Sequence, residues 1–253
     1  NPNAAHAAGD AAKQAVQTAL SDMAALLHVP AETLILTSGA SEANNLAVKG
    51  IAHARRKKGR HIISTFLEHA SVSGALTFLQ EQGWEIDLVH VTADGKLDLA
   101  HLRTLLREDT VLCAVCAADS ELGAAQPIAA LSAILKDYPN CALHVDATQV
   151  IGKCMFDFSC ADSVSFAPHK FYGLNGCGVL YKRADLILEP LIHGGTSTTL
   201  YRSGTPDPAA AAACAKALSL AHAELAQRYE TTAQRNAFLR EKLSGLVRRG
   251  AVE

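Results

Sequence analysis

The feature that most constrains the fold of this chain is its regular alternation of short apolar segments with longer segments of helical periodicity. In residues 10–28, Val16, Leu20, Met23 and Leu27 recur at the spacing of one helix face. Further helical segments are residues 41–56, 69–82, 98–106 and 128–136, and a long one that begins at Pro206 and runs toward Arg248. The apolar segments that we predict to be strands are residues 33–37, 61–64, 85–89, 111–115, 141–145, 164–166 and one that ends at Tyr181. Strands that alternate with helices of about 10–15 residues predict an α/β fold with a largely parallel sheet.

Polar residues stand just after several of the predicted strands. In a parallel sheet the carboxyl ends of the strands meet at one edge, and ligands bind beyond that edge. We therefore expect side chains from distant parts of the sequence to converge on one crevice, namely Ser41, His69, Ser120, Asp146 and Lys170. This convergence predicts a ligand-binding site independently of any family likeness.

The composition narrows the classes of function. The 253 residues are 49% hydrophobic and 19% charged with a net charge of −2, which is typical of a globular domain with a sizeable core. This balance does not indicate a nucleic-acid or membrane partner. The basic run 55–58 is interpreted as the solvated end of a helix. No apolar run reaches the roughly 18–20 residues that a membrane-spanning helix needs.

The seven cysteines follow no scaffold spacing. An odd number of scattered thiols in a chain of this size indicates a reducing, cytoplasmic compartment. Cys113 and Cys116 have the spacing of a redox or zinc motif, but they lie in an apolar predicted strand and lack a second pair of ligands. We interpret both as core residues and expect no metal site.

The segment 163–181 carries the most distinctive chemistry. It contains a short apolar strand, a turn at Pro168, the dipeptide His169-Lys170, a glycine-rich passage and a second strand. A lysine between two strands, with no carboxylate nearby in sequence, is poorly placed for a surface charge. The setting suits a lysine that acts as a covalent amine, because a pocket that disfavours the ammonium leaves a free nucleophile.

Three motifs follow one another in a distinctive order: HVDATQ at residues 144–149, His169-Lys170, and RSGT at residues 202–205. Together they resemble the cysteine desulfurase family, a pyridoxal-phosphate-dependent branch of the class V aminotransferase group, with RSGT as the signature of one subgroup. The resemblance covers nearly the whole chain. It implies the large domain of a fold type I transferase, with a mostly parallel mixed sheet flanked by helices.

The same resemblance implies an activity and partners. The family converts L-cysteine to L-alanine and transfers the sulfur to an enzyme cysteine, for iron–sulfur cluster assembly. It implies pyridoxal 5'-phosphate as cofactor, a small amino acid as substrate, and a homodimer with shared active sites. A sulfur-acceptor protein is a further expected partner.

The phosphate of the cofactor is assigned by this resemblance to a glycine turn that opens a helix, matched here by TSGASE at residues 37–42. The Ala40 N–H and the Ser41 hydroxyl are the matching donors, because free N–H groups and the helix dipole stabilise an anion. His169 is similar to a phosphate-contacting histidine. Thr205 is similar to a threonine that contacts the phosphate held by the neighbouring subunit. An ordinary helix N-cap is the alternative interpretation of the turn.

The resemblance assigns the cofactor ring to residues of HVDATQ, to Lys170 and to His69. Asp146, which follows a strand, would form a charge-assisted pair with the ring nitrogen, and Gln149 would reach the phenolic oxygen. Lys170 would form the Schiff base. His69 matches a histidine that lies over the ring and transfers protons. A helix cap is the alternative role for both Asp146 and His69.

The sequence departs from the family pattern at several positions. Ser120 stands where the family has an asparagine that helps hold the substrate carboxylate and the cofactor oxygen. We assign Ser120 to both cofactor and substrate binding, and Arg202 to substrate binding. Ala167 replaces a phosphate-binding serine, a change that costs about 1.5–3 kcal/mol if no other hydrogen bond takes over. A further departure, Thr196 to Thr198, falls near the expected dimer contact.

The expected organisation is a cofactor-binding large domain over residues 1–205 and a long helix over residues 206–253 that leads to a small domain absent from this sequence. In the family the nucleophilic cysteine lies beyond that helix, so we assign none of the seven cysteines to this role. The segment alone should hold the cofactor without desulfurating. Two other functions stay open: a divergent pyridoxal-phosphate-dependent lyase or aminotransferase for another small amino acid, and a non-catalytic dimeric paralogue.

Overall fold

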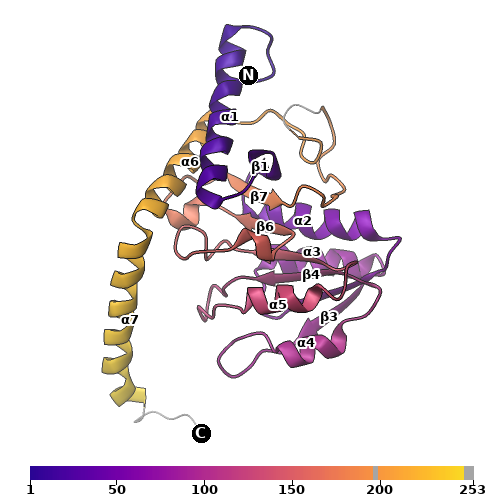
Figure 1. Cartoon of the computed structure of the whole chain (residues 1–253), viewed down its shortest axis with the longest axis vertical. Helices are drawn as coiled ribbons and strands as arrows, with labels where there is room; N and C mark the ends of the chain where they lie inside the picture. The colour runs from indigo at the N-terminus through magenta and orange to yellow at the C-terminus, as the bar shows by residue number, and fades with distance from the viewer. Residues whose placement is uncertain (196–198, 248–253) are drawn as a thin grey trace.

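The centre of the fold is a mixed seven-stranded sheet. The computed structural model of the chain describes residues 1–195 and 199–247 (Figure 1). The strands are β1 (Leu34–Thr37), β2 (His61–Thr65), β3 (Glu85–Val89), β4 (Thr110–Cys116), β5 (Ala142–Asp146), β6 (Ser163–Phe166) and β7 (Gly178–Lys182), in the spatial order β1-β7-β6-β5-β4-β2-β3. β7 pairs antiparallel with β1 and β6, and all other described pairs are parallel. The prediction of a mostly parallel mixed sheet is confirmed.

Helices cover both faces of this sheet. They are α1 (Ala7–Leu27), α2 (Ala40–Arg55), α3 (Ala70–Glu81), α4 (Leu99–Leu105), α5 (Ile128–Leu135), α6 (Pro208–Ala223) and α7 (Leu225–Val247), with short 3-10 turns η1 (Ala31–Thr33), η2 (Phe158–Cys160) and η3 (Pro168–Phe171). α2 and α3 pack on one face, and α1, α4, α5 and α6 pack on the other. Of the described helices, none combines the length and apolarity needed to cross a membrane.

The alternation of side chains along each strand divides the core into two parts. Ile62 and Leu112 pack toward α2 and α3, whereas the next residues, Ile63 and Cys113, pack toward the opposite helices. Because both faces are covered, β4 is buried at every position, which explains why its sequence is a continuous apolar run. Cys113 and Cys116 are buried within it, so their prediction as core residues is confirmed.

The C-terminal helical region differs from the predicted one. The prediction of a single long C-terminal helix is wrong. α6 ends at Ala223, Glu224 takes φ −101° and ψ 3°, and α7 starts at Leu225. α6 begins at Pro208 because the Asp207 side chain accepts hydrogen bonds from the next N–H groups. Figure 1 shows α6 alongside α1 and α7 projecting away from the sheet.

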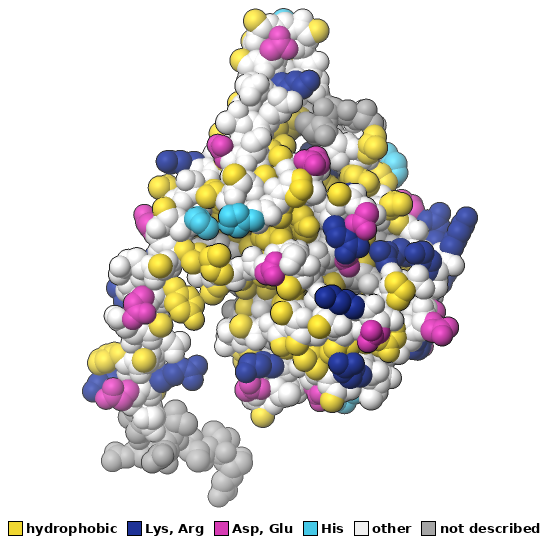
Figure 2. Space-filling model, viewed as in Figure 1, with side chains coloured by type: hydrophobic (Ala, Val, Ile, Leu, Met, Phe, Trp, Pro, Cys, Tyr) yellow, Lys and Arg dark blue, Asp and Glu magenta, His cyan; other side chains and the backbone are white. Residues whose placement is uncertain are grey.

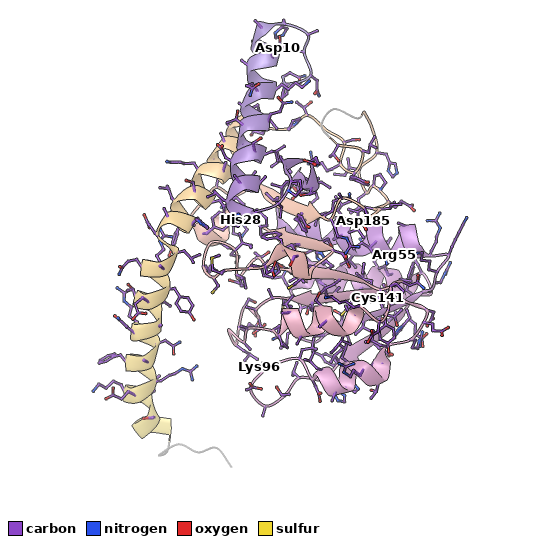
Figure 3. All side chains as sticks on the ribbon, viewed as in Figure 1. Asp10, His28, Arg55, Lys96, Cys141 and Asp185 are labelled. Carbon is purple, nitrogen blue, oxygen red and sulfur yellow. The ribbon has the colours of Figure 1, made fainter. Side chains whose placement is uncertain are left out.

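The direction of α2 determines which end of this helix lies near the carboxyl ends of the strands. Arg55, the last residue of α2, and Cys141, which precedes β5, lie at the same side of the molecule (Figure 3). The Arg55 guanidinium donates to the carbonyl of Asn140. α2 therefore runs opposite to β5, and its first turn lies toward the edge where β5 ends at Asp146.

Packing between α1 and the rest of the core gives a stability prediction. Met23 on α1 is 0% exposed and belongs to the core cluster that includes α6. We expect Met23→Ala to lower the free energy of unfolding by about 2–4 kcal/mol, because it leaves a cavity. Leu220→Ala, on α6 with 46% of the residue exposed, should change it by about 0.5 kcal/mol or less. Urea denaturation measures both, and equal losses would contradict this packing.

Candidate active site

At one edge of the sheet, the predicted carboxylate ends one strand and the predicted lysine follows the neighbouring strand. β5 ends at Asp146, which pairs with Ser165 of β6, and β6 leads into η3, which contains His169 and Lys170. Both η3 side chains are exposed. The Lys170 amine makes no hydrogen bond or ion pair with the part of the chain that the structure describes. The site therefore offers an unengaged amine one strand away from a buried carboxylate.

The turn that presents Lys170 is tightly packed. Tyr172 has a left-handed backbone with φ 68°, and the N–H of Gly173 donates to the carbonyl of Pro168 over 2.8 Å. A Cβ on Gly173 would lie 2.5 Å from the Pro168 Cβ, so a side chain is excluded there. Tyr172 closes η3 two residues after Lys170. The amine is thus carried by a short, fixed turn.

No side chain caps the first turn of α2, so its backbone N–H groups can bind an anion. Gly39 is the N-cap and supplies no side-chain hydrogen bond, while Ala40 is half-buried and Ser41 exposed. Gly178, at the start of β7, packs directly on this turn: a Cβ there would lie 2.3 Å from the carbonyl carbon of Gly39. Only glycine lets β7 approach so closely. The predicted phosphate donors therefore lie at an uncapped helix N-terminus that backbone packing holds in place.

Asp146 is held by hydrogen bonds at both oxygens. The carboxylate is on a residue only 6% exposed. Its Oδ2 accepts from Asn44 Nδ2 over 2.7 Å, and its Oδ1 accepts from the Thr148 N–H over 3.0 Å. The bond to Thr148 closes a local turn, and no described helix begins at Asp146, so the helix-cap alternative is wrong for this residue. The bond to Asn44 comes from α2. Together the two donors stabilise an ionised carboxylate in one orientation.

Asn44 is not among the predicted site residues, although the structure places it at the centre of the site. It lies on the buried face of α2 together with Ala47, Val48 and Ile51, all 0% exposed. A polar residue on an otherwise apolar helix face needs buried partners. That signal is present in the sequence, but the identity of the partner, Asp146, is not.

His69 is the N-cap of α3. Its Nδ1 accepts the N–H of Ser71 over 3.1 Å and lies 2.8 Å from the Ser71 hydroxyl. The helix-cap role that the sequence left open is therefore present. Because Nδ1 accepts a backbone N–H, the ring carries its proton on Nε2 in this arrangement. The residue is exposed, so Nε2 remains available for proton transfer.

Glu68, directly before His69, is a second functional candidate that the sequence did not reveal. Its Oε1 accepts from the Thr65 hydroxyl (2.6 Å) and from the Cys116 N–H (3.0 Å). Its Oε2 is buried with no hydrogen-bond partner among the described residues. Burial raises the pKa of Glu68 to about 8, and the negative charge of Asp146 adds to this effect. The carboxyl is therefore protonated at neutral pH.

A cleft of about 1700 Å³ opens beside Lys170 and is bordered by α7, and Figure 2 shows the hollow between this helix and the body. Ser120 and Gln149 line it together with Lys170. The Gln149 Oε1 accepts from Lys153 Nζ over 2.8 Å. Ser120 is exposed. The structure thus brings these three predicted residues to one cleft, while Ala40, Ser41, His69, Asp146 and His169 do not line it.

Arg202 binds the first turn of α2. Its guanidinium holds Glu42 through two contacts, Nε to Oε1 at 2.8 Å and a terminal nitrogen to Oε2 at 3.4 Å. Burial acts to raise the pKa of Glu42, but hydrogen bonds from Arg202 and Ser38 outweigh it and lower the pKa. Arg202 is therefore engaged by a carboxylate of the protein itself. Thr205 is exposed, and the departure at Thr196 to Thr198 lies outside the described residues.

The sequence and the fold both match known proteins. A family model described as aminotransferase class-V matches residues 1–249. The chain is 39% identical over 247 residues to a NifS/IcsS protein homolog of Lactobacillus delbrueckii subsp. bulgaricus, covering 96% of this chain and 63% of that protein. It is 37% identical over 244 residues to the cysteine desulfurase IscS of Dictyoglomus turgidum, covering 95% and 62%. A solved NifS-like protein superposes with a TM-score of 0.91 at 35% identity, covering 99% of this chain and 69% of that one.

Sheet topology and sequence agree on the class of protein: the fold is that of the fold type I pyridoxal-phosphate-dependent enzymes. Within that class, the chain belongs to the aminotransferase class-V family. The likeness to cysteine desulfurases that HVDATQ, His169-Lys170 and RSGT indicated is confirmed. The chain spans 62–63% of the length of these two curated relatives.

The buried carboxyl of Glu68 predicts an unusual dependence of stability on pH. In the unfolded chain it titrates near 4.5, and in the folded chain near 8, so the folded state binds the proton more tightly. The free energy of unfolding should therefore fall as the pH rises from about 4.5 to about 8 and level off above. Glu68→Gln keeps an oxygen acceptor for Thr65 and Cys116 but does not titrate.

Relative to this variant, the unsubstituted chain should lose on the order of 4 kcal/mol across that window. Urea denaturation at several pH values from about 5 to about 8.5 measures the difference. Parallel curves for the two proteins would show that Glu68 is ionised in the folded state.

Proposed function

We propose that this chain is the cofactor-binding part of a pyridoxal-phosphate-dependent cysteine desulfurase, which converts L-cysteine to L-alanine and passes the sulfur to a thiol. The observation that carries the proposal is the unengaged Lys170 amine on a fixed turn, next to the strand that ends in the buried Asp146 carboxylate. The names of the relatives support the substrate and the reaction. Because these relatives are longer, the activity belongs to the whole protein.

The residues at the edge of the sheet fit pyridoxal phosphate. The uncapped first turn of α2 suits a phosphate, and Asp146 suits a protonated ring nitrogen. The hydroxyl oxygen of Thr148, two residues after Asp146, is buried and has no partner in the described chain. A buried polar atom without a partner is uncommon, and a bound group at this edge would provide one.

The residues that would hold the cofactor follow from this fit. Ala40 and Ser41 would bind the phosphate together with His169, and Asp146 would pair with the ring nitrogen. Gln149 would bind the phenolic oxygen after releasing Lys153. Lys170 would hold the aldehyde carbon covalently. When bound, pyridoxal phosphate supplies an electron-withdrawing ring that stabilises negative charge at the α-carbon of an amino acid.

Two side chains of the protein can move protons at this site. The Lys170 Nζ, once it no longer holds the cofactor, is the base that we assign to the α-proton of the substrate. His69 carries its proton on Nε2, so this atom can donate it on the side away from the α3 cap. The substrate carboxylate is assigned to Ser120 and Arg202, with Arg202 released from Glu42.

The acceptor of the sulfur is assigned to a thiol other than these seven. Five of the cysteines are buried. Burial raises the pKa of the two others, Cys154 and Cys160, whereas a nucleophilic cysteine requires an accessible thiolate. All seven are free, which supports a reducing, cytoplasmic compartment and a role in sulfur delivery for iron–sulfur cluster assembly.

We also propose a homodimer with shared sites, to which Thr205 would contribute a contact to the neighbouring subunit's phosphate. Large exposed apolar side chains near the site support an interface: Phe66 is 75% exposed, Tyr172 88% and Leu200 69%.

The residues assigned to the substrate, Ser120 and Arg202, also fit a second function. Ser120 is short, and Arg202 is bound to Glu42, so a divergent lyase or aminotransferase for another small amino acid fits the same cofactor residues. Alanine formation from cysteine by the full-length protein distinguishes the desulfurase from this alternative. Failure of the chain to take up pyridoxal phosphate would instead favour a non-catalytic paralogue.

The covalent role of Lys170 gives a direct test. Pyridoxal phosphate added to the purified chain should produce a visible absorbance band, and borohydride reduction should fix the cofactor on the peptide that contains Lys170. Lys170→Ala should abolish both signals, because no other amine replaces Nζ in this turn. Difference spectroscopy and peptide mass spectrometry provide the measurements.

Lys153→Ala is the matched control, since Lys153 lies in the same cleft. This variant should still be labelled at Lys170. Equal labelling of Lys170→Ala and the unsubstituted chain would refute the assignment.

A further inference from the structure

Asn44 has every hydrogen-bonding position of its amide occupied. The residue is 0% exposed. Its Nδ2 donates to Asp146 Oδ2 (2.7 Å) and to Ser71 Oγ (2.8 Å). Its Oδ1 accepts from His144 Nε2 (3.0 Å) and from the Ser165 hydroxyl. Two donors and two acceptors are the full inventory of an asparagine side chain.

These bonds fix the orientation of the amide. A flipped amide would place its oxygen against the carboxylate of Asp146 and its nitrogen against the Ser165 hydroxyl. It would also require His144 to accept rather than donate. His144 is 0% exposed, burial lowers its pKa to about 4, and its Nδ1 lies 2.9 Å from the Ser163 hydroxyl. A neutral ring with the proton on Nε2 satisfies all of these contacts at once.

The same amide reaches the opposite side of the site through Ser71. The Ser71 hydroxyl accepts one N–H of Asn44, so its own proton is free for His69 Nδ1 at 2.8 Å. The chain of bonds runs from His69 through Ser71 and Asn44 to Asp146. It joins the N-cap of α3, the helix α2 and the end of β5.

We propose that Asn44 is a positioning residue that fixes two groups of the active site together, namely the Asp146 carboxylate and the His69 ring. This inference rests on the proposed function, since it assigns Asp146 and His69 to the cofactor. One N–H of Asn44 sets the plane of the carboxylate, and the other sets the Ser71 hydroxyl that directs His69. A disturbance on one side of the site therefore reaches the other through a single amide group.

The first test needs neither cofactor nor a variant of Asn44. In the unsubstituted chain with ¹⁵N-labelled histidine, nitrogen NMR should show His69 and His144 as neutral rings protonated at Nε2. His69→Asn and His144→Asn assign the two signals. A His69 protonated at Nδ1 would overturn the proposal, because that nitrogen could not accept from Ser71.

Substitutions then separate the two arms of the network. Ser71→Ala removes the hydroxyl that links Asn44 to His69 but keeps the backbone N–H that donates to Nδ1. It should therefore shift the Nδ1 resonance of His69, which loses one of its two donors, while the tautomer stays the same and the affinity for pyridoxal phosphate stays within about threefold. Asn44→Ala removes both arms. It should change the His69 signal and also weaken pyridoxal phosphate binding roughly tenfold or more, since it removes a hydrogen bond to a charged group. A residue with a purely structural role would not shift the Nδ1 resonance of His69.

Asn45→Ala is the matched control on the same helix. Asn45 donates to the carbonyls of Ser41 and Ser71 and does not contact Asp146. It should leave both the His69 signal and the cofactor affinity unchanged. Equal cofactor affinity of Asn44→Ala and the unsubstituted chain would overturn the proposal.

If Asn44→Ala does not fold, an unchanged Nδ1 resonance of His69 in Ser71→Ala overturns the proposal instead. The failure of the proposed function has a different signature. There the unsubstituted chain takes up no pyridoxal phosphate at Lys170, while the histidine tautomers still report on Asn44 in the cofactor-free protein.

Discussion

A carboxylate at the end of a central parallel strand needs hydrogen-bond donors or a positive partner, because both faces of the sheet are covered and water is scarce. Asp146 meets this need with two N–H donors, one from α2 and one from its own turn. The neighbouring carboxyl of Glu68 meets it differently, by keeping its proton. The site therefore holds one negative charge where two acidic residues approach each other. A cationic ring nitrogen would find a single, oriented counter-charge.

Much of the fold follows from the sequence because the strands are buried on both faces. Their apolar runs and the polar residues after them predict the parallel sheet, its functional edge, and the places of Asp146 and Lys170. The break at Glu224 was not predictable in the same way. Residues 206–248 contain no proline or glycine between Pro208 and Gly245 to mark an interruption. The end of α6 instead follows from where its packing on α1 stops, which is a property of the folded chain.

The polar network of the site was less accessible to sequence reasoning. Asn44 and Asp146 are 102 positions apart, and Asn44 and Ser165 are 121 apart. An asparagine on an apolar helix face indicates that buried hydrogen-bond partners exist, but a single sequence does not identify them. The same holds for Arg202, whose contact with Glu42 spans 160 positions. From the sequence alone, the Arg202 guanidinium would be interpreted as free to bind a substrate.

The contact between Gly178 and Gly39 has a consequence for how the protein can change over time. The atoms that obstruct a side chain at position 178 belong to the main chain of Gly39, the carbonyl carbon at 2.3 Å and the Cα at 2.6 Å. A clash with a side chain can be relieved by trimming that side chain, but no exchange of one amino acid for another removes backbone atoms. No substitution elsewhere in the chain can therefore compensate for a side chain at position 178. As long as the start of α2 stays where it is, evolution can retain only glycine there.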